Sequence, residues 1–113
     1  MPNHVPTTTV AELPADVSAV GVLLDVRELE EWRSGHAPGA THIPLAELPA
    51  RLDELPPEEP VAVICRSGVR SGQAVAWLAG QGVTAVNVAG GMQAWDAAGR
   101  DVVSEDGSEP RVI

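Results

Sequence analysis

Three near-continuous apolar runs, rich in valine, divide the chain at residues 20–26, 61–64 and 83–88. Runs of this length and composition are typical of strands that a sheet buries on both faces. Two weaker segments, residues 7–10 and 41–44, are predicted as further short strands. We therefore expect a sheet whose central strands are covered on both sides.

Helical spacing fills the intervals between these runs. Leucines recur at positions 45, 48, 52 and 55, which predicts an amphipathic helix that Pro49 can kink. The three prolines among residues 56–60 exclude regular structure there. The remaining predicted helices cover residues 10–16, 29–34, 68–79 and 92–98. Strands that alternate with helices in this way predict an α/β domain around a mostly parallel sheet.

The length of 113 residues suits one small domain. We assign residues 7–103 to this domain, residues 1–6 to a flexible start and residues 104–113 to an acidic, loose tail. Three tryptophans are the only aromatic residues. The core is therefore expected to consist of Val, Leu, Ala and Ile, with the tryptophans at important packing positions.

The net charge of -9 bears on the kind of partner the protein can bind. An acidic body repels nucleic acid and anionic membrane surfaces, so neither is an expected partner. The chain has no lysine, and two of its seven arginines, Arg66 and Arg70, closely follow Cys65. Positive charge beside a thiol favours a small anionic substrate. The alternative is that these arginines cap a loop or pair with carboxylates.

Cys65 is the only cysteine, which rules out a disulfide within the chain. No charged segment followed by an apolar one opens the sequence, and no apolar run approaches membrane length. We therefore expect a reducing, cytoplasmic location. Nothing in the pattern predicts an oligomeric state.

The segment around this cysteine has the order strand, short loop and helix N-terminus. It reads Cys65-Arg66-Ser67-Gly68-Val69-Arg70-Ser71. Backbone N–H groups in such a loop converge on an anion, and the dipole of the following helix adds partial positive charge. Both effects stabilise a thiolate. We interpret Cys65 as a nucleophile; the alternative is a small buried side chain at the end of a core strand.

Three chemistries suit a cysteine in an anion-binding loop. The loop places four residues between Cys65 and Arg70, one fewer than in Cys-x5-Arg phosphatase loops, so it forms a smaller cradle. Arsenate reduction usually needs further cysteines, which this chain lacks. Sulfur transfer requires one thiolate that takes up a sulfur as a persulfide and passes it to an external acceptor. Sulfur transfer is favoured, and the phosphatase and arsenate-reductase alternatives stay open.

Three motifs in order resemble the rhodanese family. The first runs through residues 24–28 with Trp32 and then residues 35–44, the second is the Cys65 loop, and the third is Gly90-Gly91 with Trp95. The resemblance implies a single rhodanese-like domain with a five-stranded, mostly parallel sheet flanked by helices. It also implies that Cys65 carries the persulfide. The residues implied to hold the sulfane sulfur through their backbone N–H groups are Arg66, Ser67, Gly68, Val69 and Arg70.

The resemblance also implies partners. The donor is a small anionic sulfur compound such as thiosulfate, or a persulfide, and the acceptor is cyanide in the laboratory and a thiol or protein thiol in the cell. This scheme needs no cofactor and no metal. A protein-binding module in which the thiol is incidental is the rival interpretation.

Other motif residues are expected to be structural. Asp25 and Arg27 are expected to tie together the loops at the edge of the sheet. His36 and His42 are too few for a metal site and are expected to form hydrogen bonds in turns. Trp95 and the Gly90-Gly91 pair are assigned to packing and to a tight turn.

Overall fold

A computed structural model describes residues 5–113; the first four residues of the expected flexible start lie outside the described residues. Five strands form one sheet in the order β1-β5-β4-β2-β3, and every pairing is parallel. They are β1 (Thr7–Thr9), β2 (Val22–Asp25), β3 (Thr41–His42), β4 (Val61–Ile64) and β5 (Ala85–Ala89). The expected α/β fold with a five-stranded sheet is confirmed.

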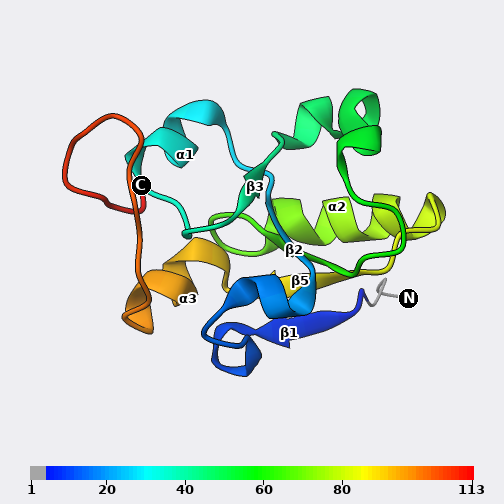
Figure 1. Ribbon diagram of the computed structural model, residues 1–113, viewed down its shortest axis with the longest axis horizontal. Coiled ribbons are helices and arrows are strands. Elements are labelled where there is room, and N and C mark those ends of the chain that lie inside the picture. Colours follow the sequence, from blue (N-terminus) through cyan, green and yellow to red (C-terminus); the bar gives the residue numbers. More distant parts are fainter. Residues whose placement is uncertain (1–4) are drawn as a thin grey trace.

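Helices lie on both faces of the sheet (Figure 1). The α-helices are α1 (Leu29–Ser34), α2 (Val69–Gly80) and α3 (Gly91–Ala97), and the 3₁₀-helices are η1 (Val10–Glu12), η2 (Val17–Val20) and η3 (Leu45–Glu54). Helices α2 and η3 lie on one side of the sheet, and α3 lies with η1 and η2 on the other (Figure 1). No helix within residues 5–113 has both the length and the apolar character to span a membrane.

The central strand β4 supplies both layers of the core. Val61 and Val63 belong to the cluster beneath α2 and η3, whereas Ala62 and Ile64 belong to the cluster beneath α3 and η1. All four side chains are almost completely buried. Each large apolar side chain buried in this way contributes about 1.5–3 kcal/mol. Burial on both faces explains why this strand appears in the sequence as a continuous apolar run.

The predicted strand at residues 20–26 is wrong at its start. Val20 ends the 3₁₀-helix η2, and Gly21 turns the chain with a φ of +106°. A Cβ at Gly21 would lie 2.3 Å from the Pro60 carbonyl oxygen, so only glycine fits there. The strand begins at Val22, whose N–H donates to the Pro60 carbonyl at 3.0 Å.

The predicted amphipathic helix at residues 45–55 is 3₁₀-helical instead of α-helical. Its backbone leaves helical geometry at Arg51, where φ is -119° and ψ is 16°. Pro49 lacks an N–H and its ring crowds the carbonyl four residues before it, so an α-helical turn cannot pass through it. The leucine spacing still identifies the inner face correctly, because Leu48 is buried and Leu45 and Leu52 pack against the core.

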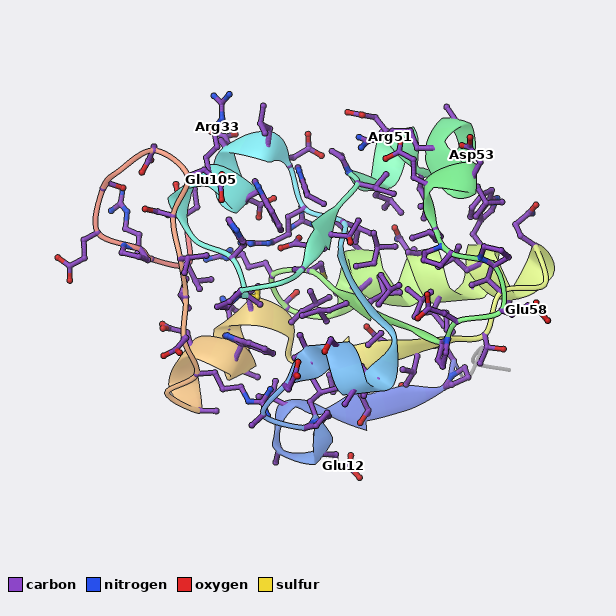
Figure 2. All side chains as sticks on the ribbon, viewed as in Figure 1. Glu12, Arg33, Arg51, Asp53, Glu58 and Glu105 are labelled. Atoms are coloured by element: carbon purple, nitrogen blue, oxygen red, sulfur yellow. The ribbon has the colours of Figure 1, made fainter. Side chains whose placement is uncertain are left out.

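The final segment, residues 104–113, runs back beside α1 (Figure 1). Its side chains are mostly exposed, in keeping with their polarity. Its main chain is nevertheless attached: the Glu105 N–H donates to the Arg33 carbonyl at 3.0 Å, and the Arg111 N–H donates to the Ser34 carbonyl at 2.9 Å. Figure 2 labels Arg33 and Glu105 where these two segments adjoin. The composition predicts a loose tail because it reflects side chains only, whereas these contacts are between main-chain groups that nearly every residue type has.

Candidate active site

Cys65 follows β4 directly, at the edge of the sheet where the parallel strands end. Strand β4 pairs with β2 on one side and β5 on the other. The chain leaves β2 toward β3 and leaves β4 toward β5, so its direction across the sheet reverses between β2 and β4. Open α/β sheets bind ligands at such a reversal, beyond the carboxyl ends of the strands. The thiol therefore lies at the expected place for a ligand.

The loop after Cys65 turns back over the sulfur through Gly68. This glycine has a φ of +110° and forms the N-cap of α2, a left-handed conformation that disfavours other residues. Its N–H donates to the Cys65 Sγ at 3.1 Å. The Ser71 hydroxyl lies 3.2 Å from the same sulfur. The loop and the first turn of α2 thus each place a hydrogen-bond donor near the sulfur.

The thiol is buried and also hydrogen-bonded, and these two effects oppose each other. Burial raises the pKa of the Cys65 thiol, because a charged sulfur loses contact with water. The Ser71 hydroxyl and the backbone N–H groups of Ser71, Gly68 and Ser67 lower the pKa, because they stabilise the thiolate. Together these donors outweigh burial, and the pKa lies below that of an ordinary thiol.

The start of α3 supports the loop from behind. The Met92 N–H donates to the Cys65 carbonyl at 2.7 Å, and the Gln93 N–H donates to the Arg66 carbonyl at 3.0 Å. A Cβ at Gly91 would lie 2.3 Å from the Cys65 carbonyl oxygen. Trp95 is buried in the core. The turn at Gly90-Gly91 and the packing of Trp95 therefore agree with the structural roles expected of them.

The two arginines of the loop differ in their surroundings. Arg66 is exposed. Arg70 donates from both terminal nitrogens to the two carboxylate oxygens of Glu31 on α1, at 2.7 and 2.9 Å. The Arg70 side chain is the main cause of a lowered pKa at Glu31, and the hydrogen bond to Glu31 likewise raises the pKa of Arg70. The guanidinium of Arg70 is therefore held by α1, which is the alternative that the sequence left open.

The remaining motif residues join neighbouring segments of the same edge. Asp25 and Arg27 form a fully buried ion pair at 2.8 Å, and Arg27 also donates to the Gly35 carbonyl at 2.7 Å. This geometry agrees with the expected tying of loops. His36 donates from Nδ1 to the Trp32 carbonyl, and His42 donates from Nε2 to the Arg27 carbonyl, each at 2.8 Å.

Those two histidines also stack against the ring of Trp32, with centroids 3.5 and 4.7 Å away. Within residues 5–113, no three His, Cys, Asp or Glu side chains gather as the ligands of a metal ion.

Two residues of the site are missing from the sequence interpretation. Asn87 on β5 lies 2.6 Å from the Ser71 hydroxyl through its Oδ1 atom, and Glu31 binds Arg70. Asn87 had a weak signal, because it is a polar residue inside an apolar run. Glu31 had none, because it lies among other acidic residues of a helix and 39 positions from its partner.

Comparison with known proteins supports the family resemblance. Residues 8–98 match the family described as "Rhodanese-like domain". The chain is 36% identical over 108 residues to a sulfurtransferase of Allochromatium vinosum, which covers 95% of this chain and 100% of that protein. A rhodanese-related protein of Thermoplasma volcanium has a similar structure, with a TM-score of 0.80 and 35% identity over 87% of this chain and 97% of that one.

A thiosulfate sulfurtransferase of Pseudomonas aeruginosa has the same TM-score of 0.80 at 28% identity. That alignment covers 96% of this chain and 21% of the other protein. The match therefore concerns one domain of a longer chain.

Proposed function

The chain belongs to the rhodanese-like domain family, and we propose that it is a sulfurtransferase that carries sulfane sulfur on Cys65. The observation that carries this proposal is the position of the sulfur, which receives the Gly68 N–H at 3.1 Å and lies 3.2 Å from the Ser71 hydroxyl. These donors favour a thiolate in a buried site. Relatives named sulfurtransferase support the same reaction class.

The proposed reaction has two displacement steps. The Cys65 thiolate attacks the outer sulfur of thiosulfate, the S–S bond of thiosulfate breaks, and sulfite leaves with the bonding electron pair. Cys65 then holds a persulfide. An acceptor thiolate or cyanide attacks the terminal sulfur, the Cys65 thiolate leaves, and the product is an acceptor persulfide or thiocyanate. No cofactor enters either step.

The loop is proposed to bind the transferred sulfur through its backbone, from Arg66 through Ser67, Gly68 and Val69 to Arg70. The Gly68 N–H supports this assignment because it already points at the Cys65 sulfur. Arg66, which is exposed, is proposed to attract the anionic donor. The guanidinium of Arg70 is proposed to keep α1 against the loop through its contact with Glu31.

Intact-mass measurement after treatment with thiosulfate tests the proposal. The wild-type protein is expected to gain one sulfur atom, and cyanide or dithiothreitol is expected to remove it. Cys65→Ser is expected to gain no sulfur and to lose thiosulfate:cyanide activity while its circular dichroism spectrum is unchanged. A serine variant that still turns over would overturn the role of Cys65.

The same measurement separates the rival function. A protein-binding module with an incidental thiol would form no adduct with thiosulfate or with a low-molecular-weight persulfide. Absence of an adduct with both donors, in a protein whose thiol still reacts with iodoacetamide, would favour the binding module over the sulfurtransferase.

A further inference from the structure

Asn87 lies in the middle of β5, the strand beside β4, and its side chain reaches the loop that surrounds Cys65. Its Oδ1 atom lies 2.6 Å from the Ser71 hydroxyl, and its Nδ2 atom donates to the Gly68 carbonyl at 3.2 Å. Gly68 and Ser71 also contact the Cys65 sulfur, Gly68 through its N–H and Ser71 through its hydroxyl. One amide side chain thus contacts two of the residues that donate to the thiol.

The orientation of this amide follows from its partners. The Gly68 carbonyl can only accept a hydrogen bond, so the NH₂ group of Asn87 must face it. The carbonyl oxygen of Asn87 must then face Ser71, and since it too can only accept, the Ser71 hydroxyl donates to it. The short distance of 2.6 Å agrees with an O–H donor.

The Ser71 hydroxyl has one proton and two acceptors within reach. Asn87 Oδ1 lies 2.6 Å from its oxygen, and the Cys65 sulfur lies 3.2 Å away. A neutral thiol is a weak acceptor, so the Ser71 hydroxyl donates to Asn87 while Cys65 is protonated. A thiolate is a charged acceptor and forms the stronger bond, so the hydroxyl then turns to sulfur. Ser71 is completely buried, so water cannot replace either partner.

We propose that Asn87 is a positioning residue that competes with the Cys65 sulfur for the hydrogen bond that the Ser71 hydroxyl donates. The proposal deepens the proposed function and rests on it, because it concerns the thiolate that attacks and later leaves. While Cys65 holds a persulfide, its inner sulfur is uncharged and Ser71 donates to Asn87. When the acceptor attacks, charge returns to that sulfur and Ser71 turns back to it, which stabilises the leaving thiolate. The Ser71 hydroxyl keeps its proton throughout this rotation, so no proton is transferred.

Asn87→Leu tests the competition, because leucine keeps the branched shape and the number of heavy atoms and offers no acceptor. In this variant the Ser71 hydroxyl can donate to the thiolate without competition from Asn87. The pKa of Cys65 is therefore expected to fall by about half a unit to one unit. Ser71→Ala is expected to raise the pKa by a similar amount. In the Ser71→Ala background, Asn87→Leu is expected to produce no fall. The pKa is measured from the pH dependence of iodoacetamide alkylation and from thiolate absorbance.

The double-mutant cycle removes the influence of other charges. The charged groups on the loop and on the neighbouring elements are the same in all four proteins: Arg66, Arg70, Glu31, Asp25 and Arg27. Their effects on the pKa of Cys65 therefore cancel when the shift caused by Asn87→Leu in the wild-type background is compared with the shift in the Ser71→Ala background. Equal pKa shifts in both backgrounds would show that Asn87 only packs the loop and would overturn the proposal. No shift in either background would overturn it as well.

A second variant guards against a folding defect. Asn87→Ala removes the same acceptor with less steric demand, and it carries the same prediction if Asn87→Leu does not fold. Alkylation needs no sulfur donor, so this test is independent of sulfur transfer. A coupled pKa together with no adduct from either thiosulfate or a low-molecular-weight persulfide would overturn the proposed function and leave the competition between Asn87 and the thiolate standing. A sulfur adduct together with uncoupled pKa shifts would overturn the role of Asn87 and leave the proposed function standing.

Discussion

At the residue scale, the state of Cys65 is decided by two opposing effects on one atom. Its side chain is almost fully buried, which raises the pKa of the thiol. The Ser71 hydroxyl and three backbone N–H groups lower it by a larger total amount. The geometry therefore favours a reactive thiolate over the small buried side chain that the sequence left as an alternative.

This shift predicts a dependence of stability on pH. The folded-state pKa of Cys65 lies below that of an unfolded thiol. Between the two values the unfolded chain binds more protons, so the free energy of unfolding rises with pH. The contribution is complete above the unfolded pKa and is lost as pH falls through the folded pKa. We expect the stability difference between wild type and Cys65→Ser to follow this course in urea denaturation.

Cys65→Ala controls for the serine hydroxyl and is expected to give the same pH dependence. A stability difference that stays constant across this range would contradict a lowered thiol pKa.

The sequence predicts a nucleophile at Cys65, but it does not predict the contacts of Asn87 and Glu31 near it. Cys65 and its glycine and serines are adjacent in the chain, so a local pattern reveals them. The Ser71–Asn87 contact joins residues 16 positions apart, and the Arg70–Glu31 contact joins residues 39 apart. A single sequence does not show which residues of distant elements lie side by side, so these contacts could be found only in the folded structure.

At the scale of elements, α3 and the Cys65 loop form one unit. The first turn of α3 donates to the carbonyls of Cys65 and Arg66, and Gly91 gives the two backbones room to approach. This contact explains why a glycine follows β5 where the chain passes the backbone of Cys65 and Arg66. The loop is therefore held by a helix that follows it later in the chain, and the parallel pairing of β4 with β5 brings the two segments together.

Gly91→Ala tests this unit, with Gly99→Ala as its matched control. Both glycines have a positive φ, +55° and +76°, so each alanine pays about 1–2 kcal/mol for a left-handed conformation. Only at Gly91 does the new Cβ meet backbone, 2.3 Å from the Cys65 carbonyl oxygen; the space at Gly99 is open. We expect Gly91→Ala to lose a further 1–3 kcal/mol or so and to slow alkylation of Cys65.

Gly99→Ala is expected to leave the alkylation rate unchanged. Equal losses of stability in the two variants, with equal alkylation rates, would mean that the close approach of Gly91 to the loop is unimportant.

The sequence predicted elements well where burial alone decides them. The apolar runs located β2, β4 and β5, and the spacing at residues 29–34 located α1 with its observed bounds. The errors occurred where backbone geometry decides. Gly21 turns the chain before β2 starts, and Pro49 prevents α-helical hydrogen bonding in η3. Apolar periodicity reports which side is buried and is insensitive to both effects.

At the scale of the whole molecule, most of the positive charge near the sheet edge is already neutralised. Arg27 is paired with Asp25, and Arg70 is paired with Glu31. Arg66 is exposed beside the thiol. In a body with a net charge of -9, this arginine is the local attraction that an anionic donor meets next to Cys65.

The terminal segment links the end of the chain to this site through α1. Its main chain binds the carbonyls of Arg33 and Ser34, Val112 packs against the core, and α1 also carries Glu31, which holds Arg70. Deleting residues 104–113 is expected to cost about 1–2 kcal/mol from the lost hydrogen bonds and the exposed apolar contact. For a domain of this size, each kcal/mol lowers the midpoint of thermal unfolding by about 4–8 °C.

Hydrogen exchange localises the effect of that deletion. Amides of α1 are expected to exchange faster in the shortened chain, whereas amides of β4 and β5 should follow only the global loss of stability. Glu105→Gln keeps the main chain in place and changes only the carboxylate 3.2 Å from the His36 ring, so it separates that contact from the backbone hydrogen bonds. An unchanged midpoint together with unchanged exchange in α1 would show that the segment lies on the helix without stabilising it.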